Sequence, residues 1–126
     1  MSNFRVSAVI TNYNNSSTIK FAIESIRKQT IKVEEVYVID DGSTDDSVRI
    51  CEAVGVRVIK MGHNRGRGFV RNTAVIESKN DIIFFLDATN TVEYSFLEKG
   101  LNWIKNKNCS AVYGKISCPT HNTSII

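Results

Sequence analysis

The chain has 126 residues, of which 42% are hydrophobic and 23% are charged, so it can bury a normal core and is not expected to be disordered. Its net charge of +3, with no basic run that resembles a binding tail, gives no support to a nucleic-acid partner. The longest wholly apolar run, 82–86, is too short to span a membrane, and the N-terminus lacks the apolar segment of a signal peptide. We therefore expect a single domain over residues 1–126 that is cytoplasmic, or peripheral at the inner face of the membrane.

Apolar and polar blocks alternate regularly along the chain. Short runs rich in β-branched residues predict strands at 5–11, 33–40, 56–61, 81–87 and 110–116. Helical spacing of apolar residues predicts helices at 16–29, 43–55, 69–78 and 94–106. The run at 81–87 is continuously apolar, as expected of a strand that is covered on both faces. This order predicts an α/β fold, a Rossmann-like three-layer α/β/α sandwich with a mostly parallel sheet.

Polar residues follow the predicted strands where each strand ends. These groups are Thr11-Asn12-Tyr13-Asn14, Asp40-Asp41, the Gly/Arg-rich segment 62–68, and Asp87-Ala88-Thr89-Asn90. Ligands of open α/β sheets bind beyond the carboxyl ends of the strands, so we expect the groups to share one site. Taken alone, Asp40 and Asp41 fit either that site or a turn, because D-D-G-S is also good turn chemistry. Asp45 and Asp46 fit a simpler role in the first turn of a helix, where carboxylates complement the helix dipole.

The segment after the third predicted strand is basic and rich in glycine. Arg65, Arg67 and Arg71 approach or begin the next helix, and Gly66 and Gly68 allow close approach of the backbone. A helix N-terminus with arginines suits an anion such as a diphosphate. The alternative is a solvated basic loop.

Four segments together resemble the N-terminal half of family 2 glycosyltransferases, which are enzymes of the GT-A fold. The segments are "VSAVITNYNNSSTIKFAIESIRKQT", "VEEVYVIDDGSTDDS", "NRGRGFVRNTAV" and "DIIFFLDATNTVEYSFLEKGL", which span about residues 5–115. The resemblance implies a nucleotide-sugar donor, most simply a UDP-sugar. It also implies transfer of the sugar, with inversion, to a hydroxyl of a sugar or lipid-linked acceptor in polysaccharide or glycolipid synthesis.

The resemblance assigns roles to five residues of the donor site. The positions of Thr11, Tyr13 and Asp41 hold the nucleotide base, and Asp40 supports that loop. The position of Arg71 lies toward the diphosphate. The residue types suit these roles, because an aromatic ring can stack on a base and a carboxylate can accept a base N–H.

The same family usually holds a divalent metal with a D-x-D segment after the fourth strand. Here that segment retains only Asp87, while Thr89 and Asn90 offer neutral oxygens. Hard divalent cations prefer carboxylates. We therefore expect Asp87 and Asn90 to bind Mg2+ or Mn2+ weakly, or only together with the donor.

The family's acceptor region and catalytic base are expected beyond residue 126, and we assign no catalytic residue within the chain. An alternative reading is a catalytically inactive nucleotide-binding or assembly module, or a fragment of a longer enzyme. A dinucleotide-binding oxidoreductase is disfavoured because the first strand is not followed by a glycine-rich turn. An exposed sheet edge or apolar surface leaves homodimer formation open.

Overall fold

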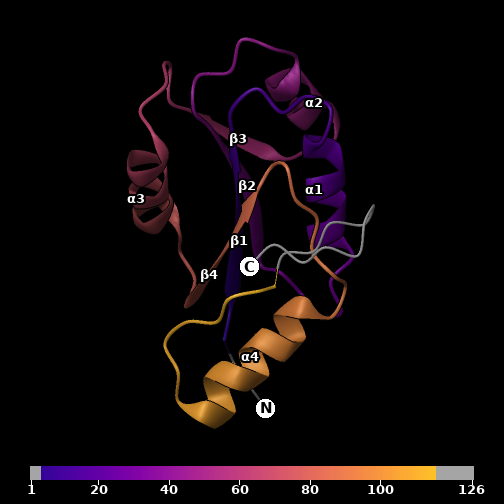
Figure 1. Ribbon diagram of the computed structural model, residues 1–126, viewed down its shortest axis with the longest axis vertical. Helices are drawn as coiled ribbons and strands as arrows, with labels where there is room; N and C mark the ends of the chain where they lie inside the picture. The colour runs from indigo at the N-terminus through magenta and orange to yellow at the C-terminus, as the bar shows by residue number, and fades with distance from the viewer. Residues whose placement is uncertain (1–3, 116–126) are drawn as a thin grey trace.

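The computed structural model describes residues 4–115, in which strands and helices alternate. The elements are β1 (Val6–Asn12), α1 (Ile19–Arg27), β2 (Glu35–Asp40), α2 (Ser47–Ala53), β3 (Arg57–Lys60), α3 (Arg67–Glu77), β4 (Ile82–Asp87) and α4 (Phe96–Lys107). The strands form one parallel sheet in the order β3-β2-β1-β4 (Figure 1). The predicted α/β fold with a mostly parallel sheet is therefore confirmed.

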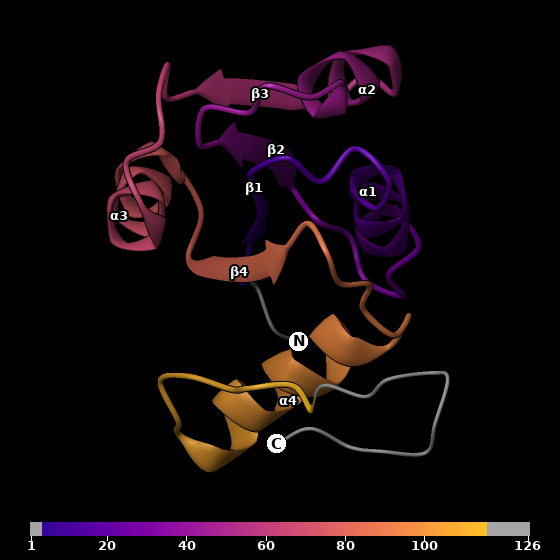
Figure 2. The ribbon, with the colours of Figure 1, turned by 45° about the horizontal axis from the view of Figure 1, so that its top comes forward.

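Helices cover both faces of this sheet (Figure 2). On one face, α1 and α2 pack over a core that includes Ala8, Ile10, Ile19, Ile23, Ile26 and Cys51. The isoleucines of α1 recur at helical spacing, so they form one apolar stripe, and burying each contributes about 1.5–3 kcal/mol. On the other face, α3 packs over a smaller core of Val9, Tyr37, Ile39, Val70 and Ala74.

The strand register decides which polar residues meet at the carboxyl end of the sheet. Thr11 pairs with Asp87, and Asn12 pairs with Asp40. Successive side chains of a strand point to opposite faces. Thr11 and Asp87 therefore lie on the α3 side of the sheet, whereas Asn12 and Asp40 lie on the side of α1 and α2.

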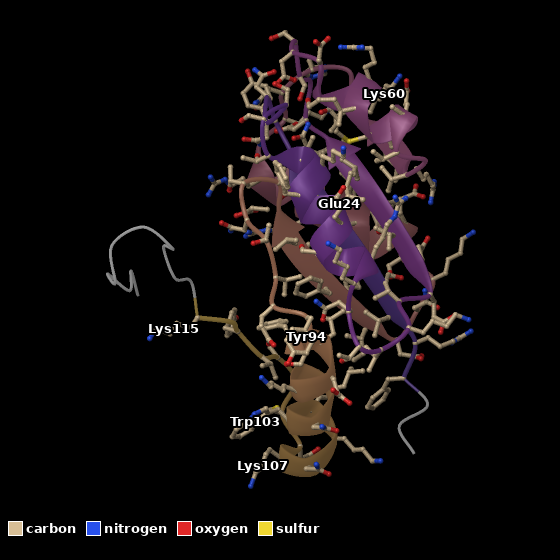
Figure 3. All side chains as sticks on the ribbon, turned by 90° about the vertical axis from the view of Figure 1, so that its right-hand side faces the viewer. Glu24, Lys60, Tyr94, Trp103, Lys107 and Lys115 are labelled. Atoms are coloured by element: carbon tan, nitrogen blue, oxygen red, sulfur yellow. The ribbon has the colours of Figure 1, made fainter. Side chains whose placement is uncertain are left out.

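β4 forms one edge of the described sheet and is less covered than its sequence predicts. Within β4 only Leu86 is buried, and Phe85 is 37% exposed. The prediction that this strand is covered on both faces holds only in part. Ile83 packs against the core under α3, and Phe84 and Leu86 pack on the other face, but most of β4 is half-buried. α4 lies at the β4 end of the molecule (Figure 1). There Phe96 contacts Phe84, with 5.6 Å between the ring centroids. Trp103 and Lys107 project from α4 (Figure 3).

The fifth strand predicted at 110–116 is not formed by residues 110–115, and residue 116 lies outside the described part of the chain. These residues are mostly exposed, and Tyr113 is 91% exposed. β-Propensity acts mainly through packing against neighbouring strands. Residues 110–115 pair with none of the described strands, so their alternating pattern has no sheet to pack on.

Candidate functional site

A cavity of about 370 Å3 opens at the carboxyl end of the sheet, beside the start of α3. Its volume lies within the range of roughly 300–1,000 Å3 that is usual for small-molecule sites. Of the seven residues assigned from the sequence to the donor or the metal, five line it: Thr11, Tyr13, Asp41, Arg71 and Asp87. Asp40 and Asn90 are not among its lining residues. The strand ends therefore converge on one cavity, as their order in the chain predicts.

Asp40 closes a turn on the side of the sheet away from Thr11, and it is only 3% exposed. Its Oδ1 accepts hydrogen bonds from Asn12 Nδ2 at 2.8 Å and from the Ser43 hydroxyl at 2.6 Å. Its Oδ2 accepts the backbone N–H of Ser43 at 2.9 Å. The Asp40 carboxylate thus fixes the turn after β2 and ties it to the end of β1, so turn chemistry describes this member of the aspartate pair.

Asp41 faces the cavity and also holds a distant loop. Its Oδ1 accepts the backbone N–H of Arg65 at 2.7 Å, and its Oδ2 accepts that of Gly66 at 3.1 Å. The residue is 7% exposed. Hydrogen bonds to an ionised acceptor are stronger than neutral ones. The Asp41 carboxylate therefore positions the segment that leads into α3.

The turn at Gly42 fits closely against the same loop. Gly42 has φ +84°, and a Cβ at this position would come within 2.6–2.8 Å of backbone atoms of His63 and Asn64. Both the backbone conformation and the space require glycine here. The turn after β2 and the segment after β3 therefore form one wall.

The N-terminal end of α3 brings two arginines to the cavity. Gly66 precedes the helix with φ +90°, and Arg67 and Arg71 both line the cavity. Arg65 instead stacks on Phe69, with its guanidinium 4.8 Å from the ring centroid, and does not line the cavity. Among the described residues, neither Arg67 nor Arg71 has an ion pair or a hydrogen-bonded side-chain partner. Two cationic side chains at the positive end of a helix are thus available to an anion.

The segment after β4 offers one carboxylate to the cavity. Asp87 Oδ1 accepts the hydroxyl of Thr11 at 2.9 Å. Thr89 lines the cavity, while Asn90 lies outside its lining and donates its backbone N–H to the Asp87 carbonyl at 3.0 Å. In residues 4–115 no three His, Cys, Asp or Glu side chains gather as metal ligands. Because Mg2+ and Mn2+ prefer carboxylate ligands, this donor set does not fit a preformed metal site.

Hydrogen bonds between two loops hold Tyr13, which is 47% exposed at the cavity. Asn14, next to it, has φ +54°, and its Oδ1 accepts the backbone N–H of Thr44 at 2.8 Å. Asp45 Oδ2 accepts the backbone N–H of Ser16 at 3.0 Å. These contacts fix the backbone that follows Tyr13. No short-range pattern signals them, because the partners lie about 30 residues apart in the chain.

Asp45 precedes α2, which begins at Ser47, and does not lie in the first turn of the helix as predicted. It accepts hydrogen bonds from the backbone and hydroxyl of Ser47, at the start of α2, in addition to the bond from Ser16. Partial desolvation raises the pKa of Asp45, but the hydrogen bonds from Ser47 and Ser16 together outweigh it and hold the pKa below its usual value of 3.8. The ionised carboxylate is the form that ties the two loops together.

The family model described as Glycosyl transferase family 2 matches residues 7–124. The chain belongs to this family. Glycosyltransferase GlyG of Streptococcus pneumoniae is 29% identical over 114 residues, which cover 86% of this chain and 38% of GlyG. The chain thus spans less than half the length of this relative.

Solved structures of glycosyltransferases have the same fold as this chain. TarS of Staphylococcus aureus, in complex with UDP, superposes with a TM-score of 0.74 at 25% identity, covering 82% of this chain and 33% of TarS. Glucosyl-3-phosphoglycerate synthase of Mycobacterium tuberculosis, in complex with Mn2+, UDP-glucose and phosphoglyceric acid, gives 0.61 at 28% identity over 68% of this chain and 34% of the synthase. The expected GT-A fold is confirmed. A divalent metal accompanies the nucleotide sugar in the second of these proteins.

Proposed function

We propose that the chain binds a nucleotide-diphospho-sugar, with a UDP-sugar as the donor of a glycosyl transfer. The observation that carries the proposal is the shared cavity, which gathers Tyr13, Asp41 and Arg71 from separate segments. The Tyr13 ring suits stacking on a nucleotide base, and the free lone pairs of Asp41 suit a base N–H. Arg71 suits the diphosphate. The UDP complex of TarS and the UDP-glucose complex of the mycobacterial synthase support the choice of uridine.

The whole protein's reaction is proposed to be transfer of the sugar, with inversion, to a hydroxyl of a sugar or lipid-linked acceptor in polysaccharide or glycolipid synthesis. Such a transfer needs a base that takes the proton of the acceptor hydroxyl. The cavity carboxylates Asp41 and Asp87 already accept hydrogen bonds, and we assign the role of base to neither. Membership of family 2 supports this reaction class.

A divalent cation at this site is proposed to bind weakly, or only together with the donor. Asp87 would supply one charged ligand, and donor phosphate oxygens would supply most of the others. Calorimetric titration with Mn2+ in the absence of nucleotide is expected to give little heat. Tight binding of Mn2+ to the nucleotide-free protein would contradict this.

Residues 1–126 are proposed to form one nucleotide-diphospho-sugar-binding domain. Between residues 4 and 115, no helix has the length and apolar character needed to cross a bilayer. We propose a cytoplasmic location, peripheral at the inner face of the membrane where the acceptor is lipid-linked. A homodimer would use the exposed edge of β4 or apolar side chains of α4 such as Trp103, which is 56% exposed.

Thermal unfolding with competing nucleotides tests the donor proposal. Ligands that bind the folded state raise the midpoint of unfolding by mass action. UDP is expected to raise the midpoint more than GDP, CDP or dTDP at the same concentration. The absence of a shift with all four would overturn the proposal.

A second candidate function is a nucleotide-binding module without catalysis. The single carboxylate at Asp87, where two would suit a metal, favours it. Release of UDP from UDP-glucose or UDP-N-acetylglucosamine separates the two functions. Turnover supports the transferase, and binding of UDP without any release supports the module.

A further inference from the structure

We infer that Arg67 and Arg71, rather than a divalent metal, neutralise the diphosphate of the bound nucleotide. The inference rests on the proposed donor site and specifies how that site compensates the charge of its ligand. Of the two metal alternatives proposed above, it selects weak binding over binding only together with the donor. A diphosphate carries several negative charges into a confined cavity, and a leaving nucleoside diphosphate gains one more as the sugar departs. Some cationic group must face those charges.

The arginines have the placement that this role needs. They lie four residues apart at the start of α3, so they share one face of the helix, and both line the cavity. Neither is engaged with an acidic side chain among the described residues. A guanidinium presents several N–H donors in a planar fork that matches phosphate oxygens. The positive end of the α3 dipole adds to the same field.

The carboxylates that line the cavity are already partly used by protein donors. Asp41 accepts two backbone N–H groups, and Asp87 accepts the Thr11 hydroxyl. The cavity lining continues after Asp87 with Ala88 and Thr89, which bring no second carboxylate. A divalent cation would therefore meet two carboxylates that are both partly used, and the charges of Arg67 and Arg71, which line the same cavity, would repel it.

The plain alternative is that Arg67 and Arg71 are ordinary solvated arginines. Arg65 provides the comparison within the same segment, because it stacks on Phe69 outside the cavity. If the alternative holds, removing the charge at Arg67 or Arg71 has the same small effect on nucleotide binding as removing it at Arg65.

The first experiment measures UDP and uridine binding to the full chain by calorimetry, in EDTA and in Mn2+. We expect the UDP dissociation constant to change by less than about threefold between the two conditions. Arg67→Gln and Arg71→Gln should each weaken UDP binding about ten- to hundredfold in EDTA, because each removes hydrogen bonds to a charged group. Both should leave uridine binding unchanged, and Arg65→Gln should behave as the unmodified chain.

Two results would overturn the inference while leaving the donor site intact: UDP binding that requires Mn2+, or Arg67→Gln and Arg71→Gln chains that bind UDP as well as Arg65→Gln. A failure of UDP, GDP, CDP and dTDP to bind in either condition would instead overturn the proposed function. The two failures are therefore distinguishable.

The second experiment restores the missing carboxylate. Thr89→Asp places an acid two residues after Asp87 at a position that lines the cavity. We expect this variant to bind Mn2+ together with UDP, seen in the electron paramagnetic resonance spectrum of the metal, and UDP to bind at least about tenfold more tightly with Mn2+ than in EDTA. A Thr89→Asp chain without any coupling between Mn2+ and UDP would show that the absent carboxylate is not the reason for metal independence, and would count against the inference.

Discussion

The carboxylate of Asp41 accepts the backbone N–H of Gly66 at 3.1 Å, across 25 residues of sequence, and so joins the turn after β2 to the start of α3. A second bond, from the N–H of Arg65, holds the same segment. The residue proposed to meet the nucleotide base therefore also positions the helix that carries Arg67 and Arg71. The base side and the diphosphate side of the cavity are linked through one carboxylate.

Removing this carboxylate should affect stability as well as binding. Asp41→Ala deprives two backbone N–H groups of a charged acceptor, and we expect the free energy of unfolding to fall by about 1–3 kcal/mol. UDP affinity should fall as well, because the start of α3 loses its anchor. Denaturant unfolding and calorimetry check both effects. Asp46→Ala is the control, since Asp46 is an exposed carboxylate that pairs with Arg49 at the surface. Equal unfolding midpoints for the two variants would show that the Asp41 hydrogen bonds do not stabilise the fold.

The Gly42 turn allows steric crowding to be separated from backbone strain. Gly42 and Gly62 have nearly the same φ, +84° and +82°, but only Gly42 has backbone atoms where a Cβ would stand. Gly62→Ala should lower the free energy of unfolding by about 1 kcal/mol, because alanine is strained in the left-handed conformation. Gly42→Ala should lower it by about 2–4 kcal/mol, because the backbone at His63 and Asn64 must also shift. Chemical denaturation of both variants measures the difference. Similar losses would mean that the close approach to His63 has little effect.

The loop contacts of Asp45 predict a dependence of stability on pH. The pKa of Asp45 is lower in the folded state than its usual value of 3.8, so its contribution is present above that pH and is lost as pH falls through the folded-state pKa. Asp45→Asn removes the ionisable group. We expect the unfolding midpoint of the unmodified chain to fall more steeply on going from pH 5 to pH 3 than that of the variant. Parallel pH profiles would contradict the loop-tying role of the carboxylate.

Much of the fold follows from local sequence. The predicted strands 5–11, 33–40 and 81–87 end within one residue of the observed β1, β2 and β4, because polar residues mark each strand end. The fifth strand was predicted from an equally good local pattern. Residues 110–115 do not form it, because a strand also needs a neighbouring strand to pair with. The coverage of β4 is only partial for a related reason, since the positions of the covering helices are a property of the tertiary structure.

The sequence predicts only part of the candidate site. Convergence of the strand ends follows from parallel topology, and the placement of Thr11 and Asp87 at the cavity illustrates it. Neighbouring side chains of a strand point to opposite faces, which explains why Asp40 holds the turn after β2 while Asp41 faces the cavity. The bonds from Asp41 and Asp45 to distant backbone N–H groups depend on loop conformation, which no periodic pattern encodes.

Nucleoside and nucleotide binding should respond differently to changes at the two ends of the cavity. Tyr13→Ala removes the stacking surface, so affinities for uridine and UDP should fall by the same factor, about ten- to hundredfold. Tyr13→Phe keeps the ring and should bind both ligands as the unmodified chain does. Stability should change little in either variant, because the side chain is 47% exposed. Arg71→Gln should lower the affinity for UDP and leave the affinity for uridine unchanged. Calorimetric titration of the three variants with uridine and UDP checks these expectations, and a Tyr13→Ala chain that loses UDP but retains uridine would place the base elsewhere in the cavity.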